Sequence, residues 1–145
     1  MEDKKIKQIS VFAENKSGRL EKITRILKSA NINIRAFNIA EAGDFGVLRM
    51  VVDQTDKAHE VLREAGFTVA ENDVLGVEMQ DTPGRLYEIA KVLGDNNVNV
   101  DYAYAFGSAT RNALLILRVD NVDNAINVLS TAGVNLFGMD DVNLV

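Results

Sequence analysis

The sequence predicts an α+β protein made of two similar βαββαβ units, and three observations lead to that prediction. Two short phrases, Asn15–Leu20 and Asp81–Leu86, both end in Gly-Arg-Leu and lie 66 residues apart. Around each phrase, apolar residues alternate as in strands or recur at helical spacing, in the same order in both halves. The period exceeds that of solenoid repeats, so each repeat is long enough to form a small domain. We therefore expect one domain at residues 1–72 and a second at residues 73–145.

The repeat extends well beyond the two phrases. At an offset of 66 the halves align from residue 11, and one extra residue in the second half then shifts the offset to 67. The identical positions of the first half are Val11, Gly18, Arg19, Leu20, Ile23, Leu27, Asn31, Asn33, Leu48, Val52, Asp53, Asp56, Ala58, Val61, Leu62, Ala65, Gly66 and Asp73. This agreement indicates an internal duplication.

Each half reads in the order strand, helix, strand, strand, helix, strand, which is the order of a ferredoxin-like unit. In the first half these elements are expected at residues 9–13, 20–30, 33–39, 45–52, 58–65 and 67–69. In the second half they are expected at residues 75–79, 86–93, 99–105, 112–119, 125–132 and 134–137. Gly66 and Gly133 mark where the second helices stop. The segment 73–79 can close the first unit, open the second, or run through both roles.

Assembly is expected because the third strand of the first half, Val47–Val52, is apolar on both faces except at Arg49. Helices cover only one face of such a sheet, and a strand that is apolar on both faces usually packs on both. The second cover would be the other unit or another subunit. Units this small also bury little core alone. We therefore predict a homo-oligomer, in the simplest case a homodimer.

Composition excludes several classes of function. The 145 residues carry a net charge of −5, which argues against a nucleic-acid partner because that needs a basic surface. No cysteine is present, so thiolate metal sites and a cysteine nucleophile are excluded. The charged N-terminus lacks a signal core, and no apolar run approaches the roughly 20 residues that span a bilayer. We expect no membrane partner and a cytoplasmic location.

No residue pattern points to catalysis. The sequence contains no Ser/His/Asp set, no metal-ligand cluster and no phosphate-binding loop. The single histidine, His59, is expected on the exposed face of a helix. We therefore predict no enzymatic activity, no catalytic residue, no metal site and no cofactor.

The turn between first strand and first helix has two interpretations. In the first, it only starts the helix, with Asn15 or Ser17 as the cap, and with Thr82 capping and Pro83 at the first helical position in the second half. In the second, Gly18 lets a ligand approach the backbone, where free N–H groups and the helix dipole hold a carboxylate. The residues alone leave these interpretations open.

Two further pairs of residues could complete such a site. Asn33 and Asn99 begin the second strands, and their amides can both donate and accept hydrogen bonds. Asn31 and Asn97 fit better as turn residues at positive φ. Arg19 and Arg85 could clamp a carboxylate, form an interface salt bridge, or lie in solvent.

These phrases, set between the first strand and first helix of a βαββαβ unit and followed by Asn33-Ile34 and Asn99-Val100, resemble those of ACT domains. The resemblance extends over the whole chain, because each half matches one complete ACT domain. It implies a regulatory protein that binds a small ligand, most often an amino acid, at interfaces between paired ACT units. ACT proteins usually carry a catalytic or DNA-binding domain beside the ACT unit, and the two repeats of this chain leave no room for one. The resemblance therefore implies that the protein regulates a separate protein or senses an amino acid.

The resemblance also implies site residues. In the serine-sensing ACT domain of phosphoglycerate dehydrogenases, an asparagine just before the glycine turn contacts the ligand, joined by an asparagine of the partner unit. Asn15 and Asn33 match these positions, whereas Asp81 replaces the first in the second half. The expected ligand-binding residues are Asn15, Lys16, Ser17, Gly18, Arg19, Leu20, Asn33, Asp81, Thr82, Pro83, Gly84, Arg85, Leu86 and Asn99. A histidine that assists ligand binding in that family corresponds to Ala13 and Met79 in this sequence. The contact made by that histidine is therefore missing here.

Three functions compete at this stage. The leading hypothesis is a non-catalytic regulator that binds an amino acid, with the first repeat as the better site because Asn15 and Asp81 differ in charge. The alternative is a ligand-independent subunit that docks on a separate enzyme of amino-acid metabolism. A small enzyme on the same fold is the third, and no constellation of residues favours it.

Overall fold

The computed structural model describes residues 4–108 and 111–142, which divide into two compact units. The first, here called the 7–72 unit, contains residues 7–72. The second, here called the 73–142 unit after its main part, contains residues 4–6, 73–108 and 111–142. From the sequence offset, we propose that the boundary between the two repeats lies between residues 72 and 73.

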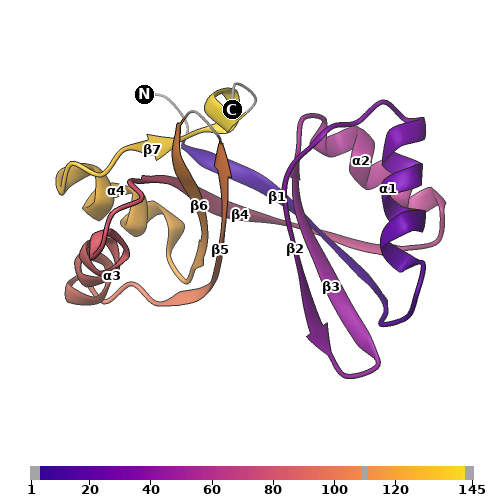
Figure 1. Ribbon diagram of the computed structural model, residues 1–145, viewed down its shortest axis with the longest axis horizontal. Helices are drawn as coiled ribbons and strands as arrows, with labels where there is room; N and C mark the ends of the chain where they lie inside the picture. The colour runs from indigo at the N-terminus through magenta and orange to yellow at the C-terminus, as the bar shows by residue number, and fades with distance from the viewer. Residues whose placement is uncertain (1–3, 109–110, 143–145) are drawn as a thin grey trace. The chain divides into compact units, whose positions relative to one another are not determined.

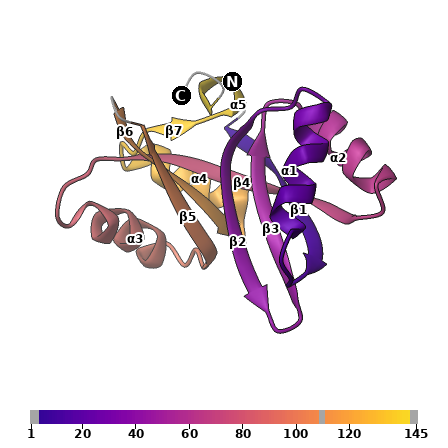
Figure 2. The ribbon, with the colours of Figure 1, turned by 45° about the vertical axis from the view of Figure 1, so that its right-hand side comes forward.

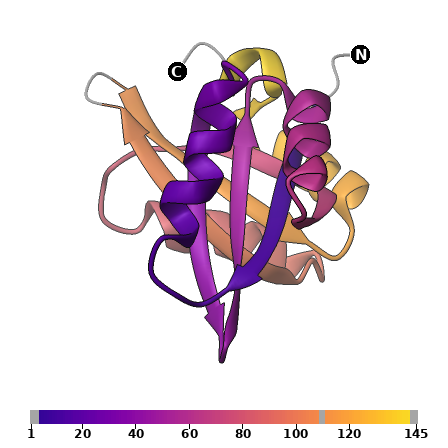
Figure 3. The same ribbon diagram turned by 90° about the vertical axis from the view of Figure 1, so that its right-hand side faces the viewer.

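The 7–72 unit places two helices on one face of an antiparallel sheet (Figures 1 and 3). Its strand order is β2-β3-β1-β4, so β2 is an edge strand. The elements are β1 (Lys5–Glu14), α1 (Arg19–Ser29), β2 (Ile34–Ala42), β3 (Phe45–Val52), α2 (Thr55–Glu64) and the start of β4 (Thr68–Met79). Figure 2 shows β2 and β3 as a long hairpin beside α1.

The 73–142 unit repeats this topology, with strand order β7-β4-β6-β5. Its helices α3 and α4 lie on one side of β5 and β6 (Figure 1). Its elements are the end of β4, α3 (Arg85–Asp95), β5 (Val100–Ser108), β6 (Arg111–Val119), α4 (Val122–Thr131), β7 (Leu136–Phe137) and α5 (Met139–Val142). The predicted α+β class with two βαββαβ units is confirmed.

The sequence leaves open whether residues 73–79 close the first unit, open the second, or do both, and strand β4 shows which of these is the case. It is a single strand of 12 residues, whose start belongs to the 7–72 unit and whose end opens the 73–142 unit. The segment therefore runs continuously through both roles. The short helix α5 is an addition to the predicted elements, and residues 143–145 lie outside the described part of the chain.

Each unit has its own hydrophobic core between helices and sheet. In the 7–72 unit, Leu48 and Met50 of β3 pack with Ile23 and Leu27 of α1 and with Leu62 of α2. The equivalent positions build the second core, in which the corresponding residues are Leu115, Leu117, Ile89, Leu93 and Leu129. Full burial of each such side chain contributes roughly 1.5–3 kcal/mol. The apolar periodicity that predicts the elements thus marks the residues that hold them together.

Candidate ligand site

The turn before α1 is capped by backbone geometry and not by a side chain. Helix α1 begins at Arg19, and its cap is Gly18, which has φ 89° in the left-handed region. No side chain accepts a hydrogen bond at this cap, so the prediction of Asn15 or Ser17 as the cap is wrong. A glycine fits because a side chain is strained at this φ. The first N–H groups of α1 have no acceptor within the helix.

The second turn has the same shape, and the prediction for its cap is also wrong. Gly84, with φ 86°, is the cap residue of α3, which begins at Arg85. Thr82 therefore does not cap the helix, and Pro83 does not occupy its first position. Pro83 stands where the first turn has Ser17 and carries no N–H, so the second turn offers one donor fewer.

Asn15 fastens the first turn to the tip of the β2–β3 hairpin. Its backbone N–H donates to the Asp44 carbonyl at 2.7 Å, and its side-chain Nδ2 donates to the Gly43 carbonyl at 3.3 Å. The amide oxygen of Asn15 forms no hydrogen bond within the described part of the chain. That oxygen is available to accept a hydrogen bond from an ammonium group.

An open hollow of about 400 Å³ lies beside the first turn. Its polar wall contains Lys16, Ser17, Gly18, Arg19 and Lys22, and its remaining lining is Phe12, Ala13, Glu14, Phe45, Gly66, Phe67 and Thr68. Glu14 is the only carboxylate among these lining residues, and it pairs with Lys16 at 3.4 Å. The lining thus carries a net positive charge and three aromatic rings, which suits an anionic group attached to an apolar one.

Arg19 and Arg85 occupy equivalent positions in different electrostatic surroundings. Arg85 donates from its guanidinium to the Glu88 carboxylate of its own helix at 2.8 Å. The position equivalent to Glu88 is Lys22 in the first repeat, and Lys22 lies 5.5 Å from the Phe67 ring centre. Arg19, which is half-buried, has no ion-pair partner within residues 4–108 and 111–142. The first turn therefore keeps two cations where the second turn has a neutralised pair.

Gly46 of β3 leaves space for the Arg19 side chain. A Cβ atom at this position would overlap the Arg19 guanidinium, so only glycine leaves room for it. Arg19 then also lines a small cavity under the turn with Leu20, Ile39 and Leu48. The arginine is thus held against the sheet rather than extended into solvent.

Asn33 and Asn99 are fixed through their backbones in the same way in both units. The Asn33 N–H donates to the Asp53 carboxylate at 3.0 Å, and the Asn99 N–H donates to Asp120 at 3.1 Å. Asp53 and Asp120 are identical positions of the repeat. Their role, which is to accept a hydrogen bond from the backbone just before each second strand, was not predicted from the sequence.

The side chains of these two asparagines differ. The Asn99 amide donates to the Asp101 carboxylate at 3.0 Å. The residue equivalent to Asp101 in the first repeat is Arg35, and the exposed Asn33 amide has no hydrogen-bond partner among the described residues. The amide of the first repeat is therefore free to bind a ligand, whereas that of the second is occupied.

Within one unit the structure does not bring all predicted site residues together. Lys16 to Arg19 share one wall, but Asn33 follows the other end of α1, whose 11 residues span about 16 Å. Leu20 and Leu86 are exposed on the first turns of their helices, as is Asp81 before the second turn. A site that uses both Asn15 and Asn33 needs a second unit to supply one of them.

His59 differs from its prediction. It is half-buried on α2, and its Nδ1 lies 2.5 Å from a carboxylate oxygen of Glu71 on β4. The expectation of an exposed surface histidine is therefore wrong, because the helix face that carries His59 turns toward β4. The pair ties α2 to β4 within the 7–72 unit.

Asn31 and Asn97 follow their predicted geometry, with φ 57° and φ 59° after α1 and α3. The described residues contain no group of three or more His, Cys, Asp or Glu side chains arranged to hold a metal ion. They also contain no helix that is both long and apolar enough to cross a membrane.

Comparison with known proteins places this geometry in a family. The sequence profile described as an ACT domain pair matches residues 4–144. The chain belongs to the ACT domain pair family. The crystal structure of protein BT0572 from Bacteroides thetaiotaomicron superposes with a TM-score of 0.90 at 38% identity, covering 96% of each chain. The resemblance to ACT domains is therefore confirmed over both repeats.

More distant solved structures share the fold. The regulatory subunit of aspartate kinase from Thermus thermophilus, in its ligand-free form, has a TM-score of 0.65 at 14% identity, covering 90% of this chain and 93% of its own. The aspartate kinase of Clostridium acetobutylicum has a TM-score of 0.56 at 20% identity, and the match covers 33% of that enzyme. A search of curated proteins gives no match.

Proposed function

We propose that this chain is a non-catalytic regulatory protein that binds an amino acid at the turn before α1. The observation that carries the proposal is the difference between the two turns. At the first, the Arg19 guanidinium has no ion-pair partner among the described residues, and Lys22 adds a second cation. At the other end of α1, the Asn33 amide also has no partner in the described part of the chain. In the second repeat, the equivalent Arg85 and Asn99 side chains pair with Glu88 and Asp101.

The chemistry of an α-amino acid fits this arrangement. Its carboxylate would lie at the N-terminus of α1, where the backbone N–H groups, the helix dipole and Arg19 favour an anion. Its ammonium group would donate to the amide oxygen of Asn15. Its side chain would extend toward the aromatic rings in the hollow. Asn33 of another ACT unit would supply the remaining amide, as the family resemblance implies.

The regulated partner is proposed by analogy. The Thermus thermophilus structure is a regulatory subunit of aspartate kinase, and this chain covers 93% of its length. We propose that the present chain likewise regulates a separate enzyme of amino-acid metabolism. A subunit that docks on such an enzyme without any ligand is the alternative.

A thermal-shift screen against the common amino acids tests the proposal. A ligand at a hundred times its Kd should add about 2.7 kcal/mol to the free energy of unfolding. Asn15→Ala should reduce this stabilisation, whereas the matched second-turn variant Asp81→Ala should keep it. If no amino acid raises the melting temperature of the wild-type protein, the ligand-binding proposal is wrong and the ligand-independent alternative is favoured.

A further inference from the structure

Two of the three phenylalanine rings that line the hollow beside the first turn are open to solvent. Phe12 of β1 is 45% exposed, and Phe45 of β3 is 59% exposed. In the register of β1 and β3, Phe45 lies opposite Glu14, two residues along from Phe12. The two phenylalanines are therefore diagonal neighbours on one face of the sheet, where aromatic side chains can reach each other. This pair of rings is here called the Phe12/Phe45 platform.

The second repeat folds in the same way without these rings. The positions equivalent to Phe12 and Phe45 carry a glutamate and an asparagine. There the Asn112 side chain donates to the Glu78 carboxylate at 3.0 Å, and the Asn135 side chain donates to the same carboxylate at 2.5 Å. The βαββαβ unit thus does not require aromatic side chains at these positions. Exposed apolar side chains that gather beside a hollow are typical of a binding surface.

The cations of the hollow are arranged for a ligand with a single carboxylate. Lys16 pairs with Glu14 at 3.4 Å, and the Lys22 ammonium lies 5.5 Å from the centre of the Phe67 ring. Arg19 is the one lining cation without an ion pair or ring contact in the described part of the chain. A ligand with a second carboxylate would have to displace Lys16 from Glu14 or Lys22 from Phe67.

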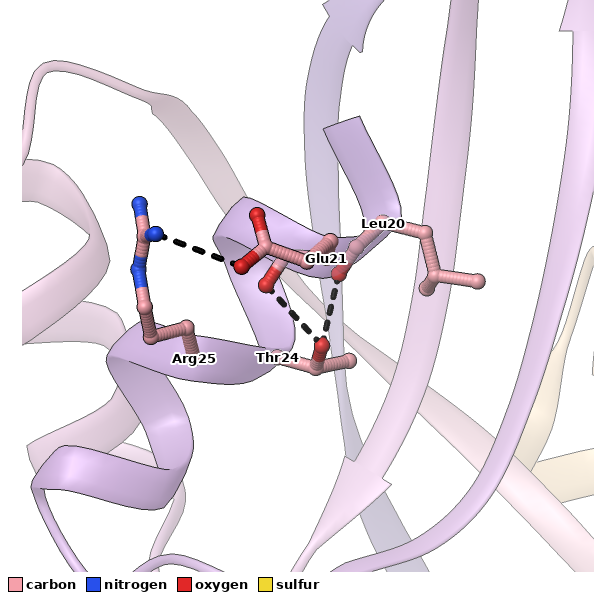
Figure 4. A network of polar contacts seen from close by, with 4 residues as sticks. All are labelled: Leu20, Glu21, Thr24 and Arg25. Atoms are coloured by element: carbon pink, nitrogen blue, oxygen red, sulfur yellow. Dashed lines mark hydrogen bonds and ion pairs between the residues drawn. The ribbon is translucent and has the colours of Figure 1, made fainter. Parts of the chain in front are cut away.

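The acidic residue in the first turn of α1 leaves Arg19 unpaired. Figure 4 shows Glu21 paired with Arg25, one turn further along the helix, and the two side chains are 3.2 Å apart. The Thr24 hydroxyl donates to the carbonyls of Leu20 and Glu21 at 2.7 and 3.1 Å. These polar side chains find their partners within α1, so the Arg19 guanidinium remains for an anion in the hollow.

We propose that the amino acid bound at the first turn has an aromatic side chain, whose ring packs on the Phe12/Phe45 platform while its carboxylate pairs with Arg19. This inference rests on the proposed function and adds the class of ligand to it. The hollow of about 400 Å³ has the size of a small-molecule pocket. Contacts between aromatic rings are more favourable than the burial of their area alone.

Phe12 and Phe45 are then the residues that determine specificity. An aliphatic side chain would bury its surface on the platform but would gain no contact between rings. An acidic side chain would face two phenyl rings and would find no unpaired cation besides Arg19. The polar side chains at the equivalent positions of the second repeat offer neither an aromatic nor an apolar surface.

A panel of amino acids that differ only in the side chain tests the ligand class. Calorimetric titration of the wild-type protein compares phenylalanine, tyrosine and tryptophan with leucine and with aspartate. The tightest of the three aromatic amino acids should bind at least about fivefold more tightly than leucine, because the contacts between rings add to apolar burial. Equal or tighter binding of leucine or aspartate would overturn the inference.

Removing one ring at a time tests the residues assigned to specificity. Phe12→Leu and Phe45→Leu keep an apolar side chain and should each weaken binding of the aromatic amino acid about two- to tenfold, with leucine binding unchanged. Both positions are half-exposed, so the variants should fold, which their melting temperatures without ligand check. Tyr87→Leu is the matched control, because this ring on α3 is 67% exposed and does not line the hollow. Unchanged aromatic binding, or equal weakening of both ligands, would overturn the role of the platform.

Phenylpropanoate separates this inference from the proposed function, since it has the carboxylate and the ring of phenylalanine but no ammonium group. If phenylpropanoate binds and no amino acid does, the aromatic subsite stands and the proposed amino-acid binding is wrong. If an amino acid binds with a preference for an aliphatic or acidic side chain, the proposed function stands and the aromatic class is wrong. If no member of the panel binds, both are wrong.

Discussion

At the scale of single residues, the two glycine turns show how backbone geometry replaces side-chain capping. Gly18 and Gly84 have nearly the same positive φ, and no side chain caps either helix. The sequence could predict that a helix starts here, because the polar turn precedes a helical pattern. It could not predict which residue is the cap, since serine, threonine and asparagine are the more frequent caps.

Replacing Gly18 tests the strain at this position. Gly18→Ala should lower the free energy of unfolding by about 1 kcal/mol, because a Cβ atom meets no neighbour there but is strained at φ 89°. Gly18→Asn should cost less, as Asn31 and Asn97 adopt positive φ in this chain. Chemical denaturation measures both variants. Equal stability of Gly18→Ala and the wild type would contradict the left-handed geometry.

The arginines that follow these glycines are identical in sequence but not in environment. What separates them is a residue three positions along the helix, Lys22 in one copy and Glu88 in the other. The sequence contains this signal, and a comparison of charges at aligned positions could have revealed it. The contact of Arg19 with Gly46 could not be foreseen, because it joins segments far apart in the chain.

Lys22→Glu would give the first turn the ion pair of the second. The new carboxylate should pair with Arg19 and lower the amino-acid affinity at least about tenfold, since an anion site loses two units of charge. Stability should fall by no more than about 1 kcal/mol, the value of the contact between Lys22 and Phe67. Glu88→Lys is the matched control and should leave the affinity unchanged. Calorimetric titration distinguishes these outcomes.

At the scale of elements, the periodic patterns predicted the order of strands and helices because the apolar positions that define the patterns are the core residues. The continuity of β4 and the short helix α5 were not predictable. The polar run Glu71-Asn72-Asp73 inside β4 resembles a break between two strands, so the sequence leaves its continuity open, and four residues are too few for a helical period. His59 shows the same limit, because its partner Glu71 lies on another element.

Gly76 in the second half of β4 is packed tightly against apolar side chains. A Cβ atom there would lie 2.7 Å from Ile6 Cδ1 and 3.3 Å from Leu114 Cδ1. Gly76→Ala should therefore destabilise the protein by about 1–3 kcal/mol through overpacking. Gly94→Ala in α3 is the control and should stabilise it by roughly 0.5–1 kcal/mol, because nothing crowds that position. Equal effects of the two changes in denaturation experiments would contradict the packing around β4.

At the scale of the whole molecule, one fold occurs twice in a chain, but only the first repeat leaves the proposed ligand-binding groups Arg19 and Asn33 unpaired among the described residues. The first repeat has Asn15, Lys22 and Arg35 where the second has Asp81, Glu88 and Asp101. Each of these differences replaces a carboxylate with an amide or a cation. The duplication explains the fold, and the charge differences between the copies carry the proposed function.

Calorimetric titration of the full chain with the amino acid selected by the screen is the decisive test of the proposed binding at the first turn. If the first turn alone binds the amino acid, we expect one binding site per chain, a loss of affinity in Lys22→Glu and Asn15→Ala, and unchanged binding in Glu88→Lys and Asp81→Ala. Two equivalent sites per chain, or a site abolished by the second-turn variants alone, would contradict it.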